Sequence, residues 1–289
     1  MAYVAHFGGK CIDAECVDRF RIPELGLEQK FADLGSRVDC VGLLSMNRVY
    51  RILRSLFLLV NPRSWGPFVQ AAEATRFDHA FLVSWSQGGE DLALLSIFGT
   101  DFKGRYLDIG AHHPSRFSLT RHLYQLGWRG VNIDANKKLI SEFTKSRPKD
   151  INLCFAIGPE KFYEFTIFSE PAISTVNIEW RDKFLSESNT IERVEVVAGR
   201  KLRDVYDEFF AHSAADILSV DAEGADFEVI KSMDFESLPA SRFPRYLLLE
   251  TPSPVSAALG AAAVKFAMSL GYTPVMVLQM STILKSPNK

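Results

Sequence analysis

The stretch Tyr106-Leu107-Asp108-Ile109-Gly110-Ala111 combines a short apolar strand, an acidic residue within it and a turn glycine directly after it. Strands of similar character are expected at 131–134, 151–157, 217–221 and 246–250. Segments of about ten residues that fit helices separate these strands. Short apolar strands that alternate with helices predict a parallel sheet covered on both faces. We therefore expect an α/β fold with a doubly wound, mostly parallel sheet.

The remaining elements complete this prediction. Residues 273–284 can supply two tightly joined strands, which brings the sheet to seven strands. Residues 161–168 alternate like a strand and predict an extra hairpin arm, and the long polar segment 169–193 is typical of a lid or a substrate-facing loop. Residues 87–91 open an expected helix whose apolar positions lie within 92–98, and the other expected helices cover residues 119–126, 137–145, 202–210, 225–233 and 255–270.

The first part of the chain lacks alternating strands, so we expect two regions. Residues 1–83 form a helical or irregular N-terminal extension, and residues 84–289 form the Rossmann-like domain. A helix is expected at 49–60, where an apolar run of five residues is far shorter than the roughly 20 that cross a membrane. We expect this helix to pack on the domain and not to contact a membrane, although Arg48, Arg51 and Arg54 leave surface binding open as an alternative.

Composition narrows the function classes. The chain has 289 residues, 47% of them apolar, and a formal net charge of −2, so it can bury a core but lacks a basic face for nucleic acid. Cys11, Cys16, Cys40 and Cys154 form no Cys-x-x-Cys pair, and residues 1–10 show no secretory signal. We expect a cytoplasmic protein with reduced thiols that does not bind nucleic acid. A homodimer is left open.

Acidic residues fall where the expected strands end. They are Asp108, Asp134, Asp221 with Glu223 just beyond it, and Glu250. The carboxyl ends of parallel strands lie at one edge of the sheet, where ligands bind near the switch in strand order. Clustered carboxylates repel one another and are unfavourable unless a positive charge or a hydrogen-bond donor interacts with them. The ligand is therefore either a metal ion or an organic cation rich in hydroxyl and amino groups.

The turn after the first strand favours the organic cation. Gly110-Ala111-His112-His113-Pro114 has one glycine where a dinucleotide fingerprint needs three, and the chain has no Walker-type Gly-Lys-Ser/Thr. Phosphate binding is therefore not indicated. Asp134 follows Asp108 by one β-α-β unit, the position from which an acid accepts hydrogen bonds from ribose hydroxyls. A nucleoside that carries a sulfonium and an ammonium in place of phosphates fits these acids.

At these residues the chain resembles the FkbM family of S-adenosylmethionine (SAM)-dependent methyltransferases. The resemblance covers about residues 84–285, and its matching segments are 106–111, 127–135, 174–175, 219–226, 249–250 and 271–272. It implies a class I methyltransferase fold, SAM as cofactor, and methyl transfer to a hydroxyl oxygen of a small molecule or glycan. The chain departs from the family pattern in two ways: His112-His113-Pro114 stands where many members have a second glycine, and Asp226 stands where glutamate is usual.

The resemblance and the strand-end acids together predict the site. The expected cofactor contacts are Gln87, Asp108, Gly110, Ala111, His112, Asp134, Ala135, Ala156 and Asp221. The expected substrate contacts are Ser174, Trp180 and Glu250. Gln87 belongs to a segment with Glu90 and Asp91 that part of the family shares before the first strand, although acids in a first helical turn also complement the helix dipole.

For catalysis we expect Asp221 and Glu223 at the reacting centre, with Glu223 as the base or the group that orients the acceptor, because a crowded acid has a raised pKa. His112 or His113 is an alternative base, since imidazole titrates near neutral pH. A second alternative has Asp221, Glu223 and Glu250 binding a divalent cation, although we expect no metal.

Three other classes of function are weighed against methyl transfer. A non-catalytic domain that binds a nucleoside or a partner would keep the fold without turnover, but retention of every strand-end acid argues against it. The single-glycine turn weakens an NAD-dependent oxidoreductase. A hydrolase lacks support because the chain has neither Gly-x-Ser-x-Gly nor His-Glu-x-x-His.

Overall fold

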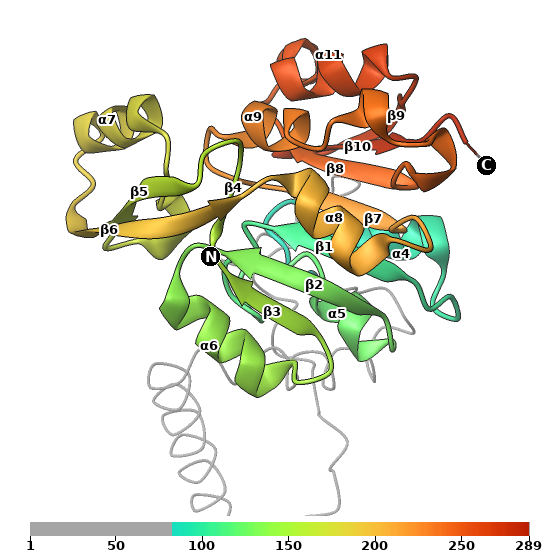
Figure 1. Cartoon of the computed structure of the whole chain (residues 1–289), viewed down its shortest axis with the longest axis horizontal. Helices are drawn as coiled ribbons and strands as arrows, with labels where there is room; N and C mark the ends of the chain where they lie inside the picture. The colour runs from blue at the N-terminus through green and yellow to red at the C-terminus, as the bar shows by residue number, and fades with distance from the viewer. Residues whose placement is uncertain (1–82, 289) are drawn as a thin grey trace, which may run out of the picture. The chain divides into compact units, whose positions relative to one another are not determined.

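The computed structural model describes residues 83–288 of the chain (Figure 1). The predicted helix at 49–60 and Cys11, Cys16 and Cys40 lie outside the described residues, so the extension and its boundary at residue 83 stay predictions. In the part that is described, no helix combines the length and the apolar character required to cross a membrane.

A seven-stranded sheet forms the centre of the domain, in the order β3-β2-β1-β7-β8-β10-β9. The first five strands of this order are parallel, and β10 runs antiparallel to both β8 and β9. The prediction of a mostly parallel, seven-stranded α/β sheet is confirmed. The strands are β1 Arg105–Ile109, β2 Arg129–Asp134, β3 Ile151–Cys154, β7 Ile217–Val220, β8 Tyr246–Glu250, β9 Thr273–Val277 and β10 Ser281–Lys285.

Strand alternation explains why helices cover both faces. Successive side chains of a strand point to opposite faces. Leu107 and Ile109 therefore pack with α8, α9 and α11, whereas Tyr106 packs on the opposite face with α4 and α5. β1 pairs with β2 on one side and with β7 on the other, so the strand order reverses between β1 and β7.

The helices of the domain are α4 Glu90–Phe98, α5 Arg121–Gln125, α6 Lys137–Ser146, α8 Leu202–Phe210, α9 Asp226–Lys231, α10 Val255–Gly260 and α11 Ala262–Ser269. Two short 3-10 helices are η4 Phe235–Ser237 and η5 Ala240–Arg242.

Two predicted elements are each divided in the structure. The strand expected at 151–157 becomes β3 and a separate strand β4, Ala156–Ile157, which pairs with a different sheet. The helix expected at 255–270 becomes α10 and α11, because Ala261 has an extended backbone with φ −59° and ψ 140°. An apolar or alanine-rich run does not show such breaks, since the residues on both sides suit the element.

A second, three-stranded sheet in the order β4-β6-β5 carries the predicted hairpin arm. We define the arm as residues 158–200; it contains β5 Phe162–Phe168, η3 Pro171–Ile173, α7 Ile178–Ser186 and β6 Ile191–Arg200. β5 and β6 confirm the hairpin. Residues 169–193 are not one loop: they contain α7, whose polar residues face solvent, and the start of β6. Figure 1 shows the arm at the end of the main sheet toward which β1 and β2 point.

Candidate functional site

A cavity of about 390 Å³ lies between the carboxyl ends of the main-sheet strands and the arm. We call it the main hollow. Its volume is in the range of small-molecule and cofactor sites. Strand ends contribute Asp134, Asp221, Glu223 and Glu250, and the arm contributes Phe165, Ser174, Trp180, Lys183 and Phe184. Four of the five predicted strand-end acids therefore line this hollow, and the fifth, Asp108, lines a smaller hollow beside it.

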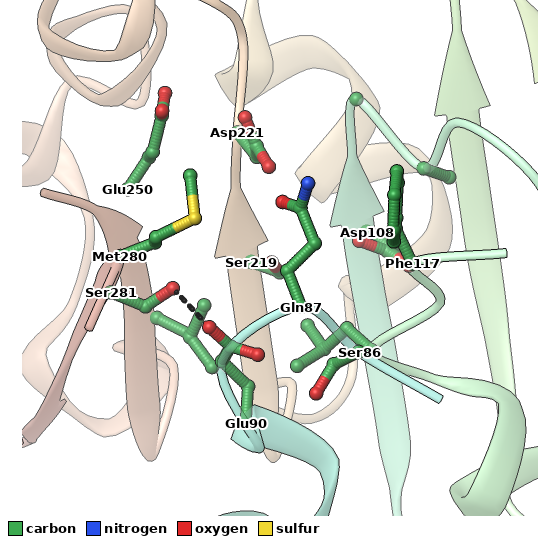
Figure 2. Close-up of a pocket in the computed structure, with 14 residues that line it drawn as sticks. Ser86, Gln87, Glu90, Asp108, Phe117, Ser219, Asp221, Glu250, Met280 and Ser281 are labelled. Carbon is green, nitrogen blue, oxygen red and sulfur yellow. Dashed lines mark hydrogen bonds between the residues drawn. The ribbon is translucent and has the colours of Figure 1, made fainter. Parts of the chain in front are cut away.

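A smaller hollow of about 50 Å³ adjoins the main one (Figure 2). The two share several lining residues, namely Gln87, Gly110, Phe117, Asp221, Glu250 and Met280. Strand alternation explains its polar wall. Asp108, Ser219 and Glu250 lie on the sheet face that α4 and α5 cover, each two residues closer to the carboxyl end of its strand than an apolar residue packed against these helices. The apolar half of this face thus forms core, and its polar end forms the pocket.

The carboxylates of β1 and β2 have several hydrogen-bond donors. Asp108, only 5% exposed, accepts from Thr120 Oγ1 at 2.9 Å. Asp134 accepts from the backbone N–H of His112 at 2.9 Å and of Asn136 at 2.7 Å. Burial raises the pKa of both groups to about 6, while these hydrogen bonds favour the ionised form and limit the rise.

The carboxyl groups after β7 and β8 face one another instead. Burial, with the neighbouring Asp221, raises the pKa of Glu223 to about 9. The pKa values of Asp221 and Glu250 are also raised, because the strand ends shield both groups from bulk water and other acids lie nearby. Lys183 on α7 supplies positive charge that partly opposes the rise for Glu223 and Glu250. This side of the main hollow holds protons when no cation is present.

The turn after β1 has a glycine at residue 110 because the backbone of Asp221 leaves no room for a side chain there. Gly110 has a φ of +73°, and a Cβ there would overlap the backbone carbonyl oxygen of Asp221. The turn therefore packs directly against the loop that carries the second group of acids. Gly110 serves this close approach, which differs from the phosphate-binding use of glycines in a dinucleotide fingerprint.

The loop that carries Glu223 is fixed by the arm. Glu223 has a φ of +47°, uncommon for a residue other than glycine. Thr175 Oγ1 donates to the carbonyl of Glu223 at 2.8 Å, and Asn177 Nδ2 donates to the carbonyl of Gly224 at 2.9 Å. The indole of Trp180 covers Gly224 so closely that a Cβ there would overlap the ring. The arm and the acidic loop thus form one unit.

The two histidines of the turn have different surroundings. His112 lines the main hollow, and burial lowers its pKa to about 4, so its ring is neutral and weakly basic at neutral pH. The structure does not bring His113 to either hollow. Its Nδ1 accepts from the N–H groups of Ser115 and Arg116 at 3.0 and 2.9 Å, and its Nε2 lies 2.9 Å from Glu142. These contacts are those of a residue that holds the turn.

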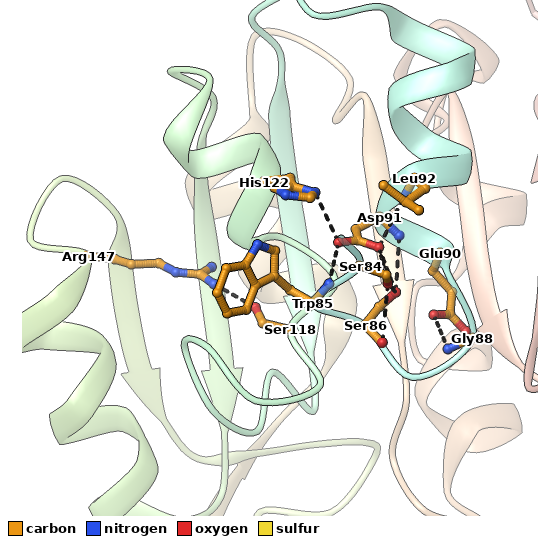
Figure 3. Close-up of polar contacts among 10 residues, drawn as sticks. All are labelled: Ser84, Trp85, Ser86, Gly88, Glu90, Asp91, Leu92, Ser118, His122 and Arg147. Carbon is orange, nitrogen blue, oxygen red and sulfur yellow. Dashed lines mark hydrogen bonds and ion pairs between the residues drawn. The ribbon is translucent and has the colours of Figure 1, made fainter. Parts of the chain in front are cut away.

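The segment before α4 delivers Gln87 to both hollows. Buried Asp91 holds this segment by accepting from Ser84 Oγ at 2.6 Å and from the backbone N–H of Trp85 at 2.8 Å, and it contacts His122 (Figure 3). Asp91 is thus a structural residue. The neighbouring Glu90 accepts from Ser281 Oγ at 3.0 Å in the smaller hollow.

Most residues predicted from the sequence lie together here. Those that line one or both hollows are Gln87, Asp108, Gly110, Ala111, His112, Asp134, Ala135, Ala156, Ser174, Trp180, Asp221, Glu223 and Glu250. The sequence did not predict Phe117, Met280, Lys183 or the two positioning side chains Thr175 and Asn177. Two of them had a recognisable signal. Thr175 lies in the segment 174–175 that resembles the family, and Asn177 is a favoured helix N-cap whose side chain accepts from the backbone N–H of Trp180 at the start of α7.

Metal binding finds no support in this arrangement. Within residues 83–288, no group of three or more His, Cys, Asp or Glu side chains could hold a metal ion. The alternative in which Asp221, Glu223 and Glu250 bind a divalent cation therefore lacks a coordinating geometry.

The strand order and the ligand crevice at the carboxyl ends of β1, β2 and β7 define a class I methyltransferase fold. Comparison with protein families supports the same class. Residues 108–243 match the methyltransferase FkbM domain, which confirms the resemblance seen in the sequence. No curated protein gives a significant match.

Solved structures show only remote similarity. The methyltransferase FkbM from Methylobacillus flagellatus KT is 12% identical, with a TM-score of 0.37 over 73% of this chain and 47% of that one. The precorrin-6y C5,15-methyltransferase from Geobacter metallireducens GS-15 is 13% identical, with a TM-score of 0.35 over 72% of this chain and 94% of that one. This chain therefore spans about half the length of the FkbM structure, and neither similarity is strong enough to support an argument about substrate.

Proposed function

We propose that this protein is a SAM-dependent methyltransferase that acts on a hydroxyl oxygen of a small molecule or glycan. One observation carries the proposal: acids from four neighbouring strand ends line adjoining hollows, beside a turn whose glycine packs on protein backbone. Such a site favours a positively charged nucleoside over a phosphorylated one.

The residues present fit the chemistry of SAM. Each carboxylate has about four acceptor positions, so Asp134 can accept from ribose hydroxyls in addition to its two backbone donors. Gln87 and Asp108 at the smaller hollow suit an amino-acid group, which carries both donors and acceptors. Asp221 and Glu223 suit a neighbouring positive charge, because their own surroundings disfavour two ionised carboxylates.

When bound, SAM supplies an electrophilic methyl group on a positively charged sulfur. Glu223 is the residue we assign to the acceptor proton. A nearby positive charge lowers the pKa of Glu223 from about 9 and so favours the carboxylate that can take this proton. Thr175 and Asn177 hold the loop of Glu223, which keeps the carboxylate aligned with an acceptor on the arm side of the main hollow.

The arm supports a hydroxylated acceptor. Ser174 and Trp180 offer a hydroxyl and an indole where the arm lines the main hollow, a combination suited to a molecule with both polar and apolar faces. Lys183 lies 4.3 Å from the centre of the Trp180 ring, so this wall also carries positive charge.

Calorimetry with SAM and with S-adenosylhomocysteine (SAH) tests the cofactor. We expect micromolar binding that weakens at least tenfold in Asp134→Ala, because a ligand hydroxyl loses a charged acceptor. Asp101→Ala is the matched control, since Asp101 is exposed and lines neither hollow. Absence of binding by both ligands would refute the proposal.

Transfer from radiolabelled SAM to a panel of glycans and hydroxylated small molecules tests the reaction. Each acceptor is paired with its deoxy analogue. Label in the hydroxylated member alone supports O-methylation, whereas cofactor binding without label in any acceptor favours the non-catalytic alternative.

A further inference from the structure

A buried arginine lies behind the smaller hollow and has no part in the function proposed above. Arg147 follows the last residue of α6 and is only 2% exposed. Its guanidinium donates to the carbonyl of Pro114 at 2.7 Å, to Ser118 Oγ at 2.6 Å (Figure 3) and to Thr120 Oγ1 at 2.7 Å. All three partners belong to the segment between β1 and α5. Removing a guanidinium from water is unfavourable unless hydrogen bonds and nearby negative charges offset the loss of hydration.

The contact with Thr120 fixes the direction of a second hydrogen bond. A guanidinium can only donate, so the hydroxyl oxygen of Thr120 must accept from Arg147. The single hydroxyl proton is then available for Asp108 Oδ2, 2.9 Å away. Arg147, Thr120 and Asp108 therefore form a chain in which each group determines the orientation of the next.

We infer that Arg147 and Thr120 are positioning residues that hold the Asp108 carboxylate toward the smaller hollow. This inference rests on the proposed function, in which Asp108 contacts the cofactor. Arg147 also ties down the turn after β1 at Pro114 and Ser118, so one side chain stabilises both the acid and the segment beside it.

The charges around Asp108 are consistent with this role. Burial raises its pKa, Thr120 and Arg147 lower it, and Asp150 raises it. Asp134 and Asp221 also interact electrostatically with Asp108 from the neighbouring strand ends. Arg147 thus supplies positive charge to a carboxylate that other acids surround.

SAH binding by three single variants provides the test. Thr120→Val keeps the shape of the side chain but removes its hydroxyl, and we expect about tenfold weaker binding or more. Thr120→Ser restores the hydroxyl and should bind within about threefold of the unaltered protein. Ser118→Ala is the matched control, because it removes another partner of Arg147 and leaves the contact of Thr120 with Asp108 in place; it should also bind within about threefold.

Thermal unfolding of each variant separates stability from positioning. Equal SAH affinity in Thr120→Val and Thr120→Ser would overturn the inference, as would a loss in Ser118→Ala as large as that in Thr120→Val. If Thr120→Val does not fold, Arg147→Lys takes its place: it keeps the charge, cannot reach three partners in fixed geometry, and should weaken SAH binding about tenfold.

The ligand-free protein allows an independent test. Carboxyl carbon NMR follows the titration of Asp108, whose midpoint should rise in Thr120→Val and in Arg147→Lys and stay unchanged in Ser118→Ala. An unchanged midpoint in all variants overturns the inference even if no cofactor binds. Failure of the unaltered protein to bind SAH would refute the proposed function alone.

Discussion

Carboxyl groups on the two sides of the adjoining hollows have different kinds of partner. On the side of β1 and β2, Asp108 and Asp134 accept hydrogen bonds from a hydroxyl and from backbone N–H groups, and their pKa values are about 6. On the side of β7 and β8, Glu223 and Glu250 face other acids, and the pKa of Glu223 reaches about 9. Burial is common to both sides, so the difference comes from the partners.

This difference indicates a division of labour. The carboxylates of β1 and β2 are largely ionised at neutral pH and are held in place, as is required to orient a ligand. Those of β7 and β8 are protonated until a positive charge arrives, as is required of a group that exchanges a proton with an acceptor. Changes at the contact between the two sides, and then on each side, test this division.

The largest effect is expected from Gly110→Ala, which separates the two sides at their point of contact. The added methyl group would overlap the carbonyl of Asp221, and we expect a loss of about 3 kcal/mol in the free energy of unfolding beyond that of Gly99→Ala. Gly99 has the same φ of +73°, and a methyl group added there would meet no atom within 4 Å, so its variant carries the strain of a positive φ without an overlap. Denaturant unfolding measures both; equal losses would contradict the close contact.

Glu223→Gln should nearly abolish methyl transfer. The amide keeps the shape of the side chain but cannot take the acceptor proton, so we expect turnover to fall at least about 100-fold. SAH affinity should stay within about threefold, because SAH has no positive charge on sulfur. The control is Glu228→Gln on the exposed face of α9. Turnover of Glu223→Gln close to that of the control would remove Glu223 from the reaction.

The preference for SAM over SAH should increase with pH. A positive sulfur favours the ionised carboxylates of β7 and β8, so SAM binding releases protons from groups that the free protein keeps protonated. Between pH 6 and 9 the ratio of the two dissociation constants should change by about tenfold in favour of SAM, since one pKa unit corresponds to a tenfold change. Glu223→Gln should reduce this dependence; a ratio that does not vary with pH would contradict it.

The ligand-free protein should lose stability as pH rises. The pKa of Glu223 is raised from its ordinary value of 4.5 to about 9, so between these values the folded state binds a proton that the unfolded chain has released. The free energy of unfolding must then decrease with increasing pH in this window. We expect Glu223→Gln to unfold about 2–4 °C above the unaltered protein at pH 8.5 and at the same temperature at pH 5. The opposite order at pH 8.5 would contradict the raised pKa.

The smallest effect is expected from Asn177→Asp. Aspartate caps a helix as well as asparagine does, so α7 should keep its start, but the donor to the carbonyl of Gly224 is lost. We expect turnover to fall about threefold to tenfold with unchanged SAH affinity, and faster hydrogen exchange in the loop at 222–226. Unchanged exchange there would show that the arm does not hold the loop.

Much of the fold could be predicted because the main-sheet elements have local signals. The expected 202–210 helix and 246–250 strand coincide with α8 and β8. β6 could not be predicted in this way: its side chains alternate between partial and full exposure, and charged residues hide the strand pattern. Its existence depends on pairing with β5, which only the folded chain provides.

The site divides in the same way. Strand-end acids could be predicted to meet because parallel strands bring their carboxyl ends to one edge. The contacts of Thr175, Asn177 and Arg147 join segments that are distant in the sequence. Neither the N-cap pattern at Asn177 nor the family-like segment 174–175 indicates which distant groups these side chains contact. For His113, no local pattern indicates that the backbone N–H groups of Ser115 and Arg116 donate hydrogen bonds to its Nδ1.

The way in which the arm joins the domain bears on how acceptor preference can change. Its two ends are adjacent, because β4 pairs with the last residues of β6 at Ala156–Gly199 and Ile157–Arg200. A segment that leaves and re-enters at one place can be lengthened, shortened or grafted from a relative without a shift in the register of the seven main strands. Under the proposed function, exchange of this segment can therefore change the acceptor range, provided that Thr175, Asn177 and Trp180 keep their contacts with the loop of Glu223.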